Sequence, residues 1–262
     1  MKAKAQIGDA TLAYLRQGHG MPLLCLHGGM GVDSGSLHVP GILDLAKENC
    51  ELVLFDQRGH GESLGSDDPA AYSHQIWAND VLRLAQHFGW KRFALLGHSY
   101  GGFIALEYAV RWQQTLSALV LVSTSAGPVS NAARFHPTNQ EHLRSCFEKC
   151  WPQFFHGADK HWEIFNQLCF SPAPYNAAFE TELSGYDLRS KAGAITVPTL
   201  LIVGDQDHYV AHMKLLSKTL PNAQLHVFPN VAHFPFVEAR DAFVATVSGF
   251  LKSIHHEPRT GK

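Results

Sequence analysis

The feature that most constrains the fold of this chain is the pentad at residues 97–101, which reads Gly-His-Ser-Tyr-Gly. An apolar run at 93–96 precedes the pentad, and a helical pattern at 103–109 follows it. This order predicts a strand, a sharp turn and a helix, with Ser99 at the apex of the turn. Glycines fit on both sides of the serine, because so tight a turn brings the backbone close to its neighbours, where a Cβ would clash. We expect the turn to lift the Ser99 hydroxyl off the strand end and to set the Tyr100 N–H at a helix N-terminus, where it can stabilise a developing oxyanion.

The composition is that of an ordinary globular protein. The chain has 262 residues, of which 45% are hydrophobic and 17% are charged, and its formal net charge is −2. This charge gives no electrostatic reason to expect nucleic acid or an anionic membrane as a partner. No apolar stretch is long enough to span a bilayer, and the first residues lack the apolar region of a signal peptide. We therefore expect a cytoplasmic protein that acts on a small molecule, and both a monomer and a homodimer remain open.

The cysteines and histidines show no spacing that predicts a metal site. Five cysteines occur, with no C-x-x-C pair among them, and we expect buried reduced thiols. Seventeen histidines occur, without an H-E-x-x-H or H-x-H pair. A long phosphate-binding loop is also absent. The sequence therefore predicts no metal and no cofactor.

Most of the chain alternates between strand-like and helical patterns. A polar, alternating stretch at 5–16 predicts an antiparallel hairpin around Gly8 and Asp9. Continuous apolar runs then predict strands that are covered on both faces, as in a parallel sheet. These runs are 22–26, 52–55, 93–96, 118–122, 199–203 and 225–228. Helical spacing falls at 42–47, 73–88, 103–109, 211–220 and 240–254. The sequence thus predicts an α/β fold, with a mostly parallel central sheet and helices on both faces.

One segment does not show this alternation of strand-like and helical patterns. Residues 126–196 contain no strand-like run but three short amphipathic patterns, near 139–151, 159–169 and 175–184, punctuated by prolines. We interpret this segment as an inserted helical cap, and residues 1–125 and 197–262 as the core domain. The cap is rich in aromatic residues, most of which we expect to form its own small core, while a few line the roof of an apolar pocket. Our candidates for contact with substrate are Met30, Trp151, Phe155, Trp162 and Phe234.

Reactive side chains follow four of the predicted parallel strands. They are the His-Gly-Gly-Met-Gly loop at 27–31, Ser99, the pair Asp205 and Asp207, and His233. Because ligands bind outside the carboxyl ends of the strands of an open parallel sheet, we expect these groups to share one site. In this order of serine, aspartate and histidine, the chain resembles the α/β-hydrolase-fold serine hydrolases over nearly its full length.

The resemblance implies a role for each of these residues. Ser99 would be the nucleophile and His233 its general base. Asp207 would orient the imidazole, with Asp205 as the alternative, which we otherwise interpret as a turn residue. The backbone N–H groups of Tyr100 and Gly29 would form the oxyanion hole, with Met30 as the alternative second donor.

Other polar residues near these loops are assigned structural roles. His27 is expected to brace the glycine loop, and His60 and His98, which flank glycines, are interpreted as structural residues. In the resembling family a salt bridge orders the loop after the second buried strand, and here Asp56 and Arg58 would form it.

The serine at the turn limits which reactions of this fold are expected. It argues against the dehalogenases and epoxide hydrolases, which use an aspartate there, and implies attack on an acyl carbon with an acyl-enzyme intermediate. The apolar, aromatic cap suits a small hydrophobic ester or lactone.

Two alternatives remain. The loops at 27–31 and 55–59 resemble the H-G-G-P-G and D-Q-R-G motifs of proline iminopeptidases, although Met30 stands where that family has proline. Such an aminopeptidase must hold a substrate ammonium, for which Glu180 and Glu182 are candidates, although charges on a cap helix often form only a solvated face. A non-hydrolytic protein of the same fold, such as a lyase, a perhydrolase or a receptor, is the other alternative.

Overall fold

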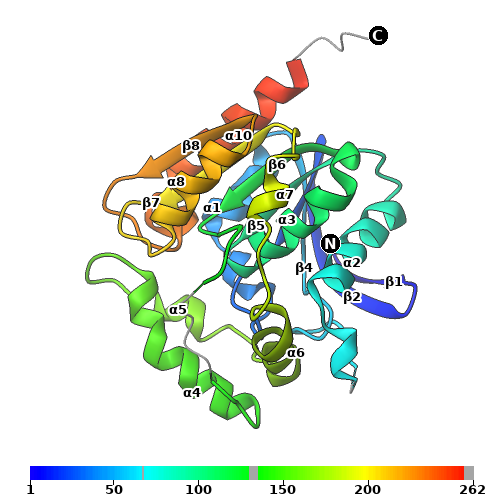
Figure 1. Cartoon of the computed structure of the whole chain (residues 1–262), viewed down its shortest axis with the longest axis vertical. Coiled ribbons are helices and arrows are strands. Elements are labelled where there is room, and N and C mark those ends of the chain that lie inside the picture. The colour runs from blue at the N-terminus through cyan, green and yellow to red at the C-terminus, as the bar shows by residue number, and fades with distance from the viewer. Residues whose placement is uncertain (67, 130–134, 257–262) are drawn as a thin grey trace.

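The sheet is mostly parallel, as the apolar runs predict. The computed structural model describes residues 1–66, 68–129 and 135–256. Its sheet has eight strands in the order β1-β2-β4-β3-β5-β6-β7-β8 (Figure 1). β1 pairs antiparallel with β2, and β2 with β4, whereas all later neighbours are parallel. The strands are β1 Lys2–Ile7, β2 Ala10–Gly18, β3 Met21–Leu26, β4 Cys50–Phe55, β5 Phe93–His98, β6 Leu116–Val122, β7 Thr199–Gly204 and β8 Ala223–Phe228. The α/β fold and the N-terminal hairpin are therefore confirmed.

Helices cover both faces of this sheet. Successive residues of a strand point to opposite faces, so Leu24 and Leu95 pack in one apolar cluster, and Leu23 and Leu96 in the other. The first cluster lies under α2, α3 and α8, and the second under α1 and α10. The α-helices are α1 Pro40–Leu43, α2 His74–His87, α3 Tyr100–Trp112, α4 Gln140–Cys150, α5 Trp162–Phe165, α6 Pro172–Ala177, α7 Arg189–Ala192, α8 Val210–Thr219, α9 Pro235–Glu238 and α10 Arg240–His256.

The ends of α2 show why a helix forms there. The Ser73 side chain accepts a hydrogen bond of 3.2 Å from Ile76 N and so caps the first turn. At the other end Gly89 has φ +72°, and the Gly89 and Trp90 N–H groups bond back to the last turn. This is a Schellman motif, in which glycine takes the left-handed conformation at little cost.

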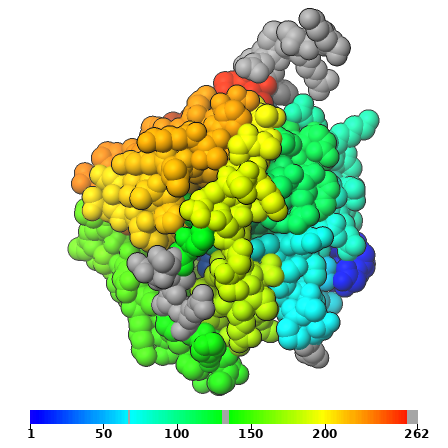
Figure 2. Space-filling model, viewed as in Figure 1, coloured from blue at the N-terminus to red at the C-terminus, as the bar shows by residue number. Residues whose placement is uncertain are grey.

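The segment between β6 and β7 is helical and contains α4 to α7. In Figure 1 α4, α5 and α6 lie together beyond one end of the sheet, and in Figure 2 the yellow stretch around α7 runs between α8 and α3. The helix expected at 159–169 is only the single turn α5, and the one at 175–184 is α6 followed by a π-helical turn, Ala178–Glu182. Prolines and glycine around these turns limit their length. The division into a core and a cap at 126–196 remains our interpretation.

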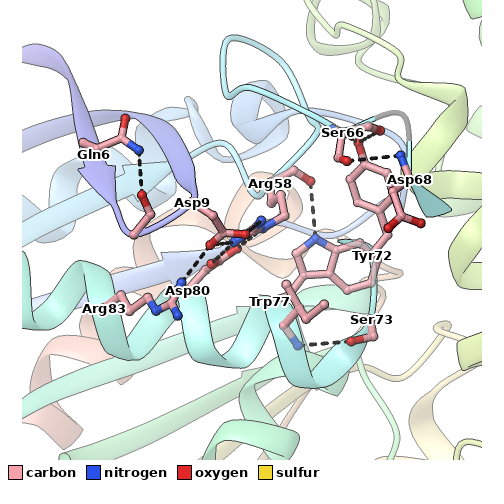
Figure 3. Close-up of polar contacts among 12 residues, drawn as sticks. Gln6, Asp9, Arg58, Ser66, Asp68, Tyr72, Ser73, Trp77, Asp80 and Arg83 are labelled. Atoms are coloured by element: carbon pink, nitrogen blue, oxygen red, sulfur yellow. Dashed lines mark hydrogen bonds and ion pairs between the residues drawn. The ribbon is translucent and has the colours of Figure 1, made fainter. Parts of the chain in front are cut away.

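The prediction of a salt bridge between Asp56 and Arg58 is wrong, because each residue binds other partners. The Arg58 guanidinium bonds instead to Asp80 of α2 at 2.7 and 2.8 Å and to Asp9 of the hairpin at 2.8 Å (Figure 3). Asp56 accepts hydrogen bonds from the Ser34 hydroxyl at 2.6 Å and from a backbone N–H at 2.8 Å. Asp56 is buried too, but its oxygens already accept from Ser34 and Glu62 N, so the buried guanidinium of Arg58 pairs with the buried Asp80 of α2 instead.

Two further sequence expectations can be compared with the described residues. Cys25, Cys50 and Cys146 are buried, but Cys150 is only partly buried and Cys169 is exposed, so the expectation of five buried thiols is wrong for these two. Both belong to the segment between β6 and β7, where Cys150 ends α4 and Cys169 lies between α5 and α6. No helix in the described ranges combines the length and the apolar character needed to cross a bilayer.

Candidate active site

Ser99 occupies a strained turn between β5 and α3. Its backbone has φ +52° and ψ −117°, a conformation that a residue with a side chain rarely adopts. The turn is held from both sides, because Ser99 N donates to Val122 O at 2.9 Å and the Thr124 hydroxyl donates to Ser99 O at 2.8 Å. The serine therefore stays at the end of β5 with its side chain facing a cavity.

The neighbouring glycines make this turn possible. A Cβ on Gly97 would lie 2.5 Å from the Gly101 carbonyl oxygen, and a Cβ on Gly101 would overlap the Leu26 carbonyl. A Cβ on Gly102 would overlap the Thr124 side chain. The Gly-x-Ser-x-Gly spacing thus follows from the close approach of α3 to β3 and β5.

His233 and Asp207 form a buried pair at the ends of β8 and β7. His233 Nδ1 lies 3.1 Å from Asp207 Oδ2 and 3.3 Å from Oδ1, and both side chains are buried. Tyr209 N donates to Asp207 Oδ1 at 3.0 Å. Burial alone would raise the pKa of Asp207, but the charge and hydrogen bond of His233 outweigh it and hold that pKa well below its usual range. Asp205 is exposed, so Asp207 is the carboxylate that reaches the histidine.

The backbone of His233 is anchored independently of its ring. His233 N donates to Phe154 O at 3.0 Å, and His98 Nε2 bonds to His233 O at 2.9 Å. Ser99 and His233 line the same cavity, and within the described residues no hydrogen bond yet joins their side chains. Catalytic hydrogen bonds of this kind are often long in unliganded enzymes and shorten when substrate binds.

Two buried histidines fix the glycine loop at 27–31 beside Ser99. His27 Nε2 accepts from Gln57 N at 3.1 Å, and His60 Nε2 accepts from Gly31 N at 3.0 Å. Burial lowers the pKa of His27 to about 4 and that of His60 to about 3, so both rings are neutral and able to accept. A Cβ on Gly28 would lie 2.7 Å from the Ser99 Cβ, which shows how close the loop comes. The Gly29 and Tyr100 backbones both border the cavity.

The cavity beside Ser99 has a volume of about 450 Å³ and mostly apolar walls. Of the five predicted contact residues, Met30, Trp151 and Phe234 line it. Phe155 does not, because it lies behind Phe234 with the two rings stacked at 4.9 Å. Trp162 does not either, since it lies at the surface and is 39% exposed.

The sequence did not single out most of the other lining residues. Most of the aromatic ones belong to the helical segment, where the sequence marks them only as members of an aromatic group, while Phe103 lies on α3 and Tyr209 follows Asp207. No sequence signal separates wall residues from core residues, because short turns have no stable periodicity. The additional lining residues with large apolar or aromatic side chains are Phe103, Phe135, Phe147, Phe154, Leu168, Tyr175, Phe179, Leu183 and Tyr209.

The two glutamates considered for ammonium binding lie outside this lining. Glu180 is exposed and faces His136, with 3.8 Å between Glu180 Oε1 and His136 Nδ1. Glu182 Oε2 accepts a hydrogen bond of 2.7 Å from His74 N at the start of α2. His74 Nε2 in turn shares a hydrogen bond of 2.7 Å with the Tyr100 hydroxyl. Glu182 therefore connects the helical segment to the Ser99 turn and does not face the cavity.

Comparison with known proteins agrees with this fold. The model of the alpha/beta hydrolase family matches residues 23–246. A curated proline iminopeptidase of Lactobacillus crispatus is 27% identical over 90% of this chain and 92% of its own length. Among solved structures, a thermophilic esterase of Thermogutta terrifontis aligns with TM-score 0.81 and 25% identity over 97% of this chain and 99% of that chain. An enol-lactonase of Burkholderia xenovorans has the same fold, with TM-score 0.81 and 24% identity over 95% of this chain and all of that chain. Because the family model spans most of its length, this chain belongs to the α/β-hydrolase family.

Proposed function

We propose that this protein is a serine hydrolase that cleaves a small, largely apolar carboxylic ester or lactone. The observation that carries the proposal is the cavity beside Ser99, whose described lining residues include many aromatic and aliphatic side chains but no carboxylate, lysine or arginine. An apolar acyl group has no polar atoms to desolvate when it enters such a cavity. A substrate ammonium would lose its hydration there without gaining a charged partner.

In this mechanism each residue of the site has one task. Asp207 accepts the Nδ1–H of His233, which leaves Nε2 free to take the proton from the Ser99 hydroxyl. The serine oxygen attacks the acyl carbon, and the negative charge that develops on the carbonyl oxygen is stabilised by the Gly29 and Tyr100 N–H groups. His233 then gives the proton to the leaving alcohol, and water releases the acyl group from Ser99 by the reverse sequence.

A second candidate is a proline iminopeptidase. It is supported by the curated relatives of that name, which are 24% to 27% identical, and by the glycine-loop motif. It requires a carboxylate for the substrate ammonium, and Glu182 is the partly buried one, with 23% of its side chain exposed. For this role the Glu182 side chain would have to leave His74 N and turn toward the cavity.

A paired assay separates the two candidates. One arm uses p-nitrophenyl esters of short to medium acyl length, the other uses a proline arylamide, and Ser99→Ala is the control in both. Ester cleavage with little arylamide cleavage, reduced by up to about 10⁶-fold in kcat in Ser99→Ala, is expected. Faster arylamide cleavage, with a raised KM in Glu182→Gln, would instead establish the aminopeptidase.

Reaction with a fluorophosphonate tests the nucleophile without a substrate. Stoichiometric labelling of Ser99 is expected, because the phosphonate needs only the serine, the base and the oxyanion donors. No labelling of folded protein, together with no turnover in either arm, would refute the serine-hydrolase proposal and favour a receptor.

A further inference from the structure

A second histidine contacts the carboxylate that orients His233. His208 directly follows Asp207, and its Nδ1 lies 3.3 Å from Asp207 Oδ1. The same oxygen lies 3.3 Å from His233 Nδ1. The two imidazole rings lie nearly parallel, with 5.2 Å between their centroids and an interplanar angle of 22°. One carboxylate oxygen thus has two imidazole nitrogens at equal distance.

These distances match the edges of a tetrahedral metal site. When zinc is bound by nitrogen and oxygen at about 2.0–2.1 Å, neighbouring ligand atoms lie about 3.3–3.4 Å apart. The oxygen of Asp207 has this separation from both nitrogens, and one ligand atom from each of the three residues lies within 4.8 Å of the other two. Two of the three ligand edges therefore already have the length that one tetrahedral ion requires.

The chemistry and the surroundings of the cluster also suit an ion. A carboxylate oxygen and two imidazole nitrogens are ligands that zinc accepts in proteins. The Asp207 side chain is fully buried, whereas 56% of the His208 side chain is exposed. The exposed side of His208 gives an ion access and leaves room for water as a further ligand.

We propose that Asp207, His208 and His233 form an inhibitory binding site for Zn²⁺ in the hydrolase. The loss of activity rests on the function proposed above, whereas the binding does not. In the active form the His233 proton is on Nδ1 and the lone pair on Nε2 accepts the serine proton. When the metal takes the Nδ1 lone pair, the proton moves to Nε2, so that no proton is released and no electron is transferred. His233 can then no longer accept a proton from Ser99.

His208 is the residue that distinguishes this cluster from an ordinary aspartate–histidine pair. The described residues contain one other cluster of this kind, formed by Asp159, His161 and Glu163. Its carboxylates are 75% and 65% exposed, so they must be ordered before they can bind, and we expect a weaker site there. His161→Gln is therefore the matched control for His208→Gln.

The test measures binding and inhibition separately. Zn²⁺ affinity is measured by competition with a chromophoric zinc indicator, and inhibition by the hydrolysis of a p-nitrophenyl ester with and without Zn²⁺, followed by chelation with EDTA. We expect reversible inhibition of the wild type, a Kd and an inhibitory concentration raised at least about tenfold in His208→Gln, and no change in His161→Gln. Because each variant is compared with its own zinc-free rate, a change in its basal activity does not affect the result.

Several outcomes would overturn the proposal. One is a His208→Gln variant that binds Zn²⁺ as tightly as the wild type, and another is a wild type that binds none at millimolar Zn²⁺. Inhibition that disappears in Cys169→Ser but persists in His208→Gln would place the ion on the exposed thiol. If the protein cleaves no ester yet binds Zn²⁺ through His208, the metal site stands and only the proposed reaction fails.

Discussion

Mild acid is expected to destabilise this protein strongly, because four histidines are held neutral in its interior. His27, His60, His74 and His98 are between 0% and 5% exposed. Burial lowers the pKa of His27 and His74 to about 4 and that of His60 and His98 to about 3, from an ordinary value of 6.5. Between about pH 6.5 and pH 4 the unfolded chain therefore binds protons that the folded protein does not, so stability is full above this range and falls as the pH is lowered through it.

The size of the effect follows from these pKa values. Lowering the pH from about 7 to about 5.5 reduces the free energy of unfolding by about 1.2 kcal/mol for each histidine, or by about 5 kcal/mol for all four. Asp33 acts in the opposite direction, because burial and a neighbouring carboxylate raise its pKa to about 6, and it offsets about 0.8 kcal/mol. The net loss of about 4 kcal/mol is a large part of the about 5–15 kcal/mol by which proteins of this kind are stable.

Urea-induced unfolding at the two pH values, followed by far-UV circular dichroism, measures this loss. His60→Gln removes one of the four groups and should reduce the pH-dependent loss by about 1.2 kcal/mol, whatever its effect at neutral pH. His87→Gln, at an exposed position on α2, should leave the loss unchanged. A wild-type loss below about 1 kcal/mol would show that the histidines are not buried neutral in solution, and would refute the reasoning.

Two further predictions concern carboxylates that the structure distinguishes. Asp80→Ala should lower the free energy of unfolding by about 3–5 kcal/mol, because it leaves the buried Arg58 guanidinium without its buried partner. Asp9→Ala removes a 70% exposed partner of the same guanidinium and should cost less than about 1 kcal/mol in the same urea experiment; equal losses would contradict the assignment. Asp207→Asn should lower kcat for the ester by about 10⁴-fold, because the amide no longer fixes the His233 tautomer. Asp205→Asn should have little effect, and a similar loss there would show that the wrong carboxylate was chosen.

The local elements could be predicted from the sequence because they depend on neighbouring residues. The apolar run, the glycines and the helical pattern around Ser99 specify a strand, a turn and a helix whatever the rest of the chain does. The position of the candidate site followed from the same patterns, since parallel strands bring Ser99, Asp207 and His233 to one edge of the sheet. The structure places these three side chains together, and their catalytic roles remain the proposal that the assays test.

Only the tertiary structure determines which side chains from distant parts of the chain contact one another. Arg58 bonds to Asp80 and Asp9 rather than to nearby Asp56, because the packing of α2 and the hairpin brings those carboxylates to it. Phe154 lines the cavity whereas its neighbour Phe155 packs behind Phe234, a difference that depends on the path of a short turn. Side-chain spacing along a sequence determines which residues share a face of a helix or strand, but which groups that face meets depends on how separate elements pack.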